Sequence, residues 1–182
     1  MNVPNRLTVL RVCMIPLFVV AMLWEALPYS EYIAGGIFIV ACITDFFDGF
    51  LARKYNLVTL FGKFMDPLAD KLLVCASLIC FVANPTSVMP VWVAIIIISR
   101  EFIISGFRLV AAERGVVIAA SYWGKVKTAT QMIMSILLIF DFPYDFFHVL
   151  EIIFVYAALI FTVISLIDYI IKNKEVMKEG NK

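Results

Sequence analysis

Charged residues are scarce in this sequence. Aspartate, glutamate, lysine and arginine make up 16% of its 182 residues, whereas apolar residues make up 63%. A soluble domain usually has about 25% charged and about 45–50% apolar residues, so this composition excludes an ordinary soluble globule. One bilayer crossing takes about 20 apolar residues, which leaves room for about six crossings and for no second folded domain. We therefore expect residues 1–182 to form a single integral membrane domain, and nucleic acid is not expected as a ligand.

The sequence also lacks CxxC pairs and a small-residue cleavage site after its first apolar run. The four cysteines lie in apolar runs and form no CxxC pair: Cys13, Cys42, Cys75 and Cys80. This pattern is typical of small buried hydrophobic residues and argues against a disulfide framework or a zinc site. No small-residue cleavage site follows the first apolar run, so we interpret that run as a retained helix.

Six apolar runs are present along the chain. They cover residues 7–24, 32–52, 61–83, 88–109, 119–140 and 146–171. Breakers such as Pro28, Asn84-Pro85, Pro90, Gly115 and Pro143 separate them. The expected fold is an all-α bundle of six transmembrane helices.

Basic residues gather at alternate connections. Lysine and arginine lie at both termini and around the second and fourth connections, whereas the first, third and fifth connections carry no basic residue, and the first and fifth carry acidic ones. Connections rich in lysine and arginine stay in the cytoplasm. We therefore expect a multi-pass protein of the cell membrane with both termini on the cytoplasmic side.

Four aspartates interrupt the second and third apolar runs near that side. Asp45 and Asp48 are spaced i, i+3, and Asp66 and Asp70 are spaced i, i+4, so each pair shares a helical face. An ionisable group inside a bilayer costs at least about 2.5–3.5 kcal/mol, so the four acids need a compensating partner. Their oxygens favour hard ions such as Mg²⁺ or Mn²⁺, and two such ions can stabilise the attacking and leaving oxygens around phosphorus. A set of mutually satisfied buried acids is the alternative.

Small and basic residues accompany the aspartates. Gly49 and Gly62 let a bulky ligand approach the backbone, and the small side chain of Ala52 leaves space on the same face of the second helix. Arg53 offers a fixed cation for a phosphate. Packing between helices is the alternative explanation for each glycine.

Together these residues form one spaced motif. It consists of Asp45, Asp48, Gly49, Ala52, Arg53, Gly62, Asp66 and Asp70. The motif resembles the full signature of the CDP-alcohol phosphatidyltransferase family. The resemblance implies a six-helix membrane fold, commonly a homodimer, in which an acceptor hydroxyl attacks the β-phosphorus of a CDP-activated lipid such as CDP-diacylglycerol and CMP leaves.

The resemblance also implies a role for each residue of the motif. Asp45, Asp48 and Asp66 would mainly be metal ligands. Asp70 would take the proton of the attacking hydroxyl and would also lie near a metal. The cytidine and diphosphate would be held by Gly49, Ala52, Arg53 and Gly62.

A second polar set indicates the acceptor. Arg108 and Lys125, with Lys127 and Arg11, form an expected basic pocket. A phosphate monoester carries nearly two negative charges and needs several cations, so we expect a phosphorylated acceptor. Snorkelling to lipid headgroups is the alternative for Lys127 or Arg114 alone. Arg100 and Glu101 are expected to pair with each other or with groups on neighbouring helices.

The segments 100–131 and 4–11 resemble one branch of the same family. This branch uses sn-glycerol 3-phosphate as acceptor and makes phosphatidylglycerophosphate, and on that basis Asn5 and Thr8 join the expected acceptor-phosphate residues. Another acceptor, such as inositol phosphate or phosphatidylglycerol, remains open. A divalent-cation transporter is an alternative from another class, although the outer halves of the runs lack a matching ladder of polar groups.

The last apolar run receives no catalytic role. His148 lies at its outer end and is expected at the membrane interface. Glu151 and Asp168 lie in or near the membrane, and we expect no partner for them at helical spacing.

Overall fold

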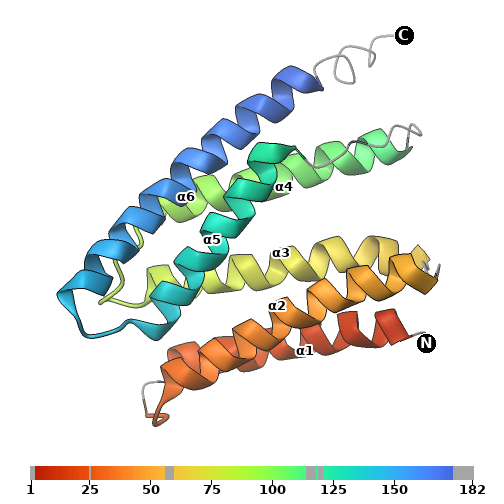
Figure 1. Cartoon of the computed structure of the whole chain (residues 1–182). Helices are drawn as coiled ribbons and strands as arrows, with labels where there is room; N and C mark the ends of the chain where they lie inside the picture. Colours follow the sequence, from red (N-terminus) through yellow and green to blue (C-terminus); the bar gives the residue numbers. More distant parts are fainter. Residues whose placement is uncertain (1–2, 25, 56–59, 114–117, 119–120, 174–182) are drawn as a thin grey trace. The chain divides into compact units, whose positions relative to one another are not determined.

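The computed structural model describes the backbone of residues 3–24, 26–55, 60–113, 118 and 121–173. Within these segments, the side chains of residues 3–7, 45–55, 60–67, 70 and 113 lie outside the description. The regular elements of the described part are α1 (Val3–Leu23), α2 (Ser30–Tyr55), α3 (Leu60–Ala83), α4 (Val91–Glu113), α5 (Tyr122–Phe140) and α6 (Asp145–Lys172) (Figure 1). The predicted all-α class and the six predicted helices are confirmed.

The helices fall into two compact units. Unit 1 comprises Met1–Ser87 with Leu138–Asp141, and unit 2 comprises Val88–Leu137 with Phe142–Lys182. Unit 1 therefore contains α1, α2, α3 and the last residues of α5. Unit 2 contains α4, most of α5, and α6.

In unit 1, α1 packs against both α2 and α3. α1 and α2 run side by side in opposite directions (Figure 1), and the rings of Phe18 and Phe38 lie 5.9 Å apart between them. Gly35 of α2 faces Phe140, because a Cβ atom at Gly35 would lie only 2.6 Å from the Cζ atom of that ring. The missing side chain thus lets Phe140 lie against the backbone of α2.

In unit 2, α4 packs against α6. The ring pairs Trp92–Tyr156 and Phe107–Tyr169, each 6.4 Å apart, join the two helices. The first turn of α5 stacks Trp123 on Phe161 of α6, at 6.2 Å and an interplanar angle of 23°. Ser121 caps α5, since its Oγ accepts a hydrogen bond of 3.1 Å from the Gly124 amide.

The described side chains include many exposed apolar residues and several buried polar ones. Large apolar residues are exposed along every helix, for example Leu17, Ile95 and Ile153, each more than half exposed. The buried residues include many polar or charged ones: Thr8, Arg11, Ser77, Arg100, Lys127, Gln131, Ser135, Glu151, Thr162 and Ser165. Such a distribution is favoured where helices face hydrocarbon and polar groups must find partners inside the protein.

The lengths of the apolar segments differ between helices. Among the described residues, α6 is the one helix long and apolar enough to cross a bilayer by itself. Shorter apolar stretches cover Thr8–Leu23, Ser30–Thr44 and Lys71–Ala83. Six helices are therefore confirmed, whereas six membrane crossings stay a prediction.

The cysteines follow the prediction in part. Cys75 and Cys80 are buried, Cys42 is half-buried, and none of the four is in a disulfide. The prediction of a buried side chain is wrong for Cys13, which is exposed. Cys13 lies two residues after the buried Arg11, which is about 200° around a helix, so it lies on the opposite face of α1.

Candidate functional site

The predicted aspartates belong to one end of unit 1. Positions 45 and 48 lie in the second half of α2, and positions 66 and 70 lie in the first half of α3. Only residues 56–59 separate the two helices, so the end of α2 and the beginning of α3 lie at the same end of the unit (Figure 1). The structure thus places the two helical segments that carry the motif at one end.

The side chains of all predicted nucleotide and metal residues, and of one predicted acceptor residue, lie outside the described residues. This applies to Asn5, Asp45, Asp48, Gly49, Ala52, Arg53, Gly62, Asp66 and Asp70. In the part of the chain that the structure does describe, no group of three or more His, Cys, Asp and Glu side chains is placed to hold a metal ion. The roles assigned to the motif therefore stay predictions.

Of the three predicted acceptor residues on α1, two have described side chains. Thr8 and Arg11 are both fully buried and are spaced i, i+3, so they share one face of the helix. They lie in the first half of α1, which runs antiparallel beside the second half of α2 (Figure 1). A fully buried guanidinium requires polar or anionic neighbours. Arg11 lies at the same end of unit 1 as the helical segments that carry the motif aspartates.

Unit 2 contains a buried charge cluster formed by Arg100, Glu101 and Lys127. The Nη1 atom of Arg100 donates to Oε1 of Glu101 at 3.0 Å, and the same oxygen accepts from Nζ of Lys127 on α5. The three side chains are 10%, 13% and 3% exposed. The prediction that Arg100 and Glu101 pair with each other or with neighbouring helices is confirmed in both respects.

The sixth helix supplies a further member of this cluster. Nη2 of Arg100 donates to Oγ of Ser165, which is fully buried on α6. Gly124 of α5 lies beside this contact, since a Cβ atom there would be 3.8 Å from Ser165 Oγ and 3.9 Å from Arg100 Nη2. Sequence reasoning missed Ser165, although Thr162 and Ser165, spaced i, i+3 in an otherwise apolar run, were a usable signal.

The three cations predicted to bind the acceptor phosphate in unit 2 differ in exposure. Lys127 is buried and bound to Glu101, so it does not snorkel to the surface. Lys125 and Arg108 are exposed. Arg114, the other residue considered for snorkelling, lies outside the described residues.

Two acids of α6 do have partners at helical spacing, so the prediction that they lack them is wrong. Nδ1 of His148 lies 3.8 Å from Oε2 of Glu151, at i, i+3. Nζ of Lys172 lies 2.7 Å from Oδ1 of Asp168, at i, i+4. Both pairs are local, because His148 and Lys172 each lie one helical turn from the acid that they contact. His148 is exposed, and its place at the membrane interface stays a prediction.

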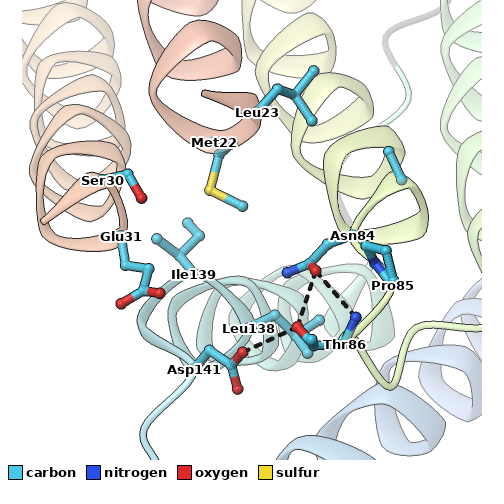
Figure 2. Close-up of a pocket in the computed structure, with 11 residues that line it drawn as sticks. Met22, Leu23, Ser30, Glu31, Asn84, Pro85, Thr86, Leu138, Ile139 and Asp141 are labelled. Atoms are coloured by element: carbon cyan, nitrogen blue, oxygen red, sulfur yellow. Dashed lines mark hydrogen bonds between the residues drawn. The ribbon is translucent and has the colours of Figure 1, made fainter. Parts of the chain in front are cut away.

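A recess of about 320 Å³ lies elsewhere in unit 1. Its wall includes Glu31, Asn84, Thr86 and Asp141 (Figure 2), and the Thr86 hydroxyl donates to Asn84 Oδ1 at 2.9 Å and lies 3.5 Å from Asp141 Oδ2. The recess is formed where α1 ends, α2 begins and α3 ends. It is therefore at the opposite end of these helices from the predicted aspartates.

Comparison with known proteins decides the family. The CDP-alcohol phosphatidyltransferase family matches residues 1–164 of the chain. The chain belongs to this family. The CDP-alcohol phosphatidyltransferase resemblance of the aspartate motif is thereby confirmed, and the matched region extends from α1 through most of α6.

Several relatives within the family are named for the same activity. A CDP-diacylglycerol--glycerol-3-phosphate 3-phosphatidyltransferase of Bacillus subtilis is 43% identical, with 99% of each chain covered. An enzyme of that name from Haemophilus influenzae is 42% identical over 93% of this chain and 91% of its own. Another from Shigella flexneri is 38% identical, with 93% of each chain covered.

Proposed function

We propose that this chain transfers the phosphatidyl group of CDP-diacylglycerol to sn-glycerol 3-phosphate, giving phosphatidylglycerophosphate and CMP. The observation that carries the proposal is the full-length similarity to relatives named for this reaction, at 43% identity over 99% of the chain for the Bacillus subtilis enzyme. The unbroken aspartate motif on α2 and α3 supports it independently.

Divalent metal ions fit the acids of the motif. The donor set of Asp45, Asp48, Asp66 and Asp70 consists only of carboxylate oxygens, which suit Mg²⁺ or Mn²⁺ and not softer metals. Both helices that carry the set reach the same end of unit 1. Two bound ions would neutralise charge on the diphosphate and on the leaving CMP.

Asp70 is assigned the proton transfer. Its carboxylate accepts the proton of a glycerol 3-phosphate hydroxyl, whose oxygen forms a bond to the β-phosphorus while the bond between that phosphorus and the CMP oxygen breaks. We assign the cytidine and diphosphate to Gly49, Ala52, Arg53 and Gly62. The small residues leave room at the backbone, and the guanidinium matches phosphate oxygens.

The acceptor phosphate is assigned to basic and polar residues. They are Asn5, Thr8, Arg11, Arg108, Lys125 and Lys127. Burial of Thr8 and Arg11 on one face of α1 supports a polar function for that face. Charge also supports the assignment, because a phosphate monoester is best held by several cations.

We further propose that the protein crosses the cell membrane several times with both termini in the cytoplasm, and that it acts as a homodimer. The exposed apolar helix faces and the buried polar residues support a lipid environment. The placement of lysine and arginine supports the orientation. The homodimer rests on the family resemblance.

An acceptor screen tests the proposed reaction. Purified protein in detergent is supplied with CDP-diacylglycerol, Mg²⁺ and one of four conditions: glycerol 3-phosphate, inositol phosphate, phosphatidylglycerol or no acceptor. We expect CMP release to be at least tenfold faster with glycerol 3-phosphate than in the other conditions. Faster release with another acceptor would reassign the substrate, and no release with any acceptor would refute the transferase activity.

A further inference from the structure

In unit 2, two side chains of α4, Arg100 and Glu101, connect this helix to α5 and α6. Oε1 of Glu101 on α4 accepts from both Arg100 and Lys127, which ties α4 to α5. Ser165 then accepts from the other terminal nitrogen of Arg100, which ties α4 to α6. The Arg100 guanidinium is therefore fixed at both Nη atoms, and the Lys127 ammonium is fixed at a carboxylate.

Burial restricts the side chains of this cluster and strengthens their electrostatic interactions, because little water screens them. Two cations and one carboxylate give Arg100, Glu101 and Lys127 a formal charge of +1, at side-chain exposures of 13% or less. Charges interact more strongly away from bulk water, and an ion pair held by neighbouring groups loses little conformational freedom when a ligand binds. A preformed site of this kind favours an anion.

A second observation on the same face of α5 indicates a ligand. Gln131 lies one turn beyond Lys127 and is 3% exposed, yet neither its amide nitrogen nor its amide oxygen has a hydrogen-bond partner within the described part of the protein. An unsatisfied buried amide costs about 1–3 kcal/mol, which a structural role would not require. A polyhydroxylated ligand offers both a donor and an acceptor for this amide.

We propose that Glu101 and Ser165 are positioning residues for the acceptor site, which they serve by holding Lys127 and Arg100 ready for the phosphate of a small phosphorylated alcohol. The inference rests on the proposed function and extends it to two residues outside the aspartate motif. Glu101 aligns both cations through one oxygen, and Ser165 of α6 prevents the guanidinium from turning away.

Steady-state kinetics with both substrates test the proposal. Glu101→Gln keeps the size of the side chain but leaves two buried cations without a carboxylate between them. We expect its KM for glycerol 3-phosphate to rise at least tenfold, with the KM for CDP-diacylglycerol changed less than twofold. Ser165→Ala is the milder variant in case Glu101→Gln folds poorly. It should raise the KM for glycerol 3-phosphate about threefold. Ser165→Thr keeps a hydroxyl at this position and should have the wild-type KM.

Thr162→Val is the matched control. Thr162 is also fully buried on α6, one turn from Ser165, and its hydroxyl has no hydrogen-bond partner among the described residues. Both KM values should stay at the wild-type level in this variant. A rise in both KM values together in Glu101→Gln or Ser165→Ala, or an unchanged KM for glycerol 3-phosphate, would overturn the proposal.

A direct measurement of glycerol 3-phosphate binding tests the positioning role independently of turnover. The Kd of glycerol 3-phosphate for the wild-type protein and for Ser165→Ala is measured without CDP-diacylglycerol. If the wild type binds glycerol 3-phosphate but releases no CMP, the proposed function fails, and a weaker Kd in Ser165→Ala still supports the positioning role. An equal Kd in the two proteins refutes the positioning role even when turnover is normal.

Discussion

Lys127 of α5 binds the same carboxylate oxygen of Glu101 that accepts the guanidinium of Arg100, although Lys127 and Glu101 lie 26 positions apart. This shared oxygen makes the cluster sensitive to the loss of any one member. It also distinguishes Lys127 from Lys125, which is exposed two residues earlier on the same helix.

The two lysines should therefore respond differently to neutralisation. Lys127→Met removes one cation from a buried carboxylate that keeps Arg100, so we expect a loss of about 1–3 kcal/mol in stability together with weaker glycerol 3-phosphate binding. Lys125→Met should raise the KM for glycerol 3-phosphate and leave stability unchanged. Thermal unfolding in detergent measures the difference, and equal melting temperatures in the two variants would contradict the buried pairing.

Gln131→Leu should separate stability from function. Removing an amide that lacks partners in the described structure should leave the melting temperature unchanged or raise it by a few degrees. If the amide contacts the acceptor, the KM for glycerol 3-phosphate should rise severalfold in the same protein. A melting temperature and a KM that both match the wild type would show that Gln131 does not contact the acceptor.

Adjacent glycines on α2 offer a test of the packing in unit 1. A methyl group at Gly35 would lie 2.6 Å from the Phe140 ring, whereas nothing lies within 4 Å of a Cβ atom at Gly36. Gly35→Ala should thus destabilise the protein by about 1–3 kcal/mol, because the ring must move. Gly36→Ala should be neutral or slightly stabilising. A higher melting temperature for Gly35→Ala than for Gly36→Ala would show that Phe140 does not lie against α2.

Much of this fold follows from the apolar runs and their breakers. Asn84 follows the end of α3, Pro90 precedes α4 and Pro143 precedes α6, as the sequence predicts. The two ion pairs within α6 were also predictable, because His148 and Glu151 are one turn apart, as are Asp168 and Lys172.

Contacts between helices were harder to predict. Periodicity identifies a face of a helix but not the neighbour that this face meets. Ser165 lies 65 positions from Arg100, and its short side chain does not distinguish a hydrogen-bond partner of a guanidinium from a packing residue. The motif aspartates were identified from their spacing and from the family resemblance, and their roles remain predictions.

The acids of the motif should separate into two classes on substitution. Asp45→Asn, Asp48→Asn and Asp66→Asn each remove an anionic ligand from a shared metal site, so turnover should fall by orders of magnitude. Near-normal CMP release in any two of these variants would refute the two-metal proposal.

Asp70→Asn should nearly stop turnover for a different reason. Asparagine keeps the shape and a hydrogen bond to the hydroxyl but cannot take its proton, so the affinity for CDP-diacylglycerol should be comparatively preserved. Binding of CDP-diacylglycerol by Asp45→Asn and Asp70→Asn is compared at saturating Mg²⁺. Equal loss of binding in the two would leave Asp70 as one more metal ligand.

The most direct measurement of the central claim quantifies both products of the reaction in one assay. Purified protein is given CDP-diacylglycerol and glycerol 3-phosphate before chelation of divalent ions, after chelation, and after readdition of Mg²⁺ or Mn²⁺. The account predicts CMP and phosphatidylglycerophosphate in equal amounts, loss of both on chelation, and recovery of both with the added metal. CMP release that proceeds equally without glycerol 3-phosphate, or product formation unaffected by chelation, would contradict it.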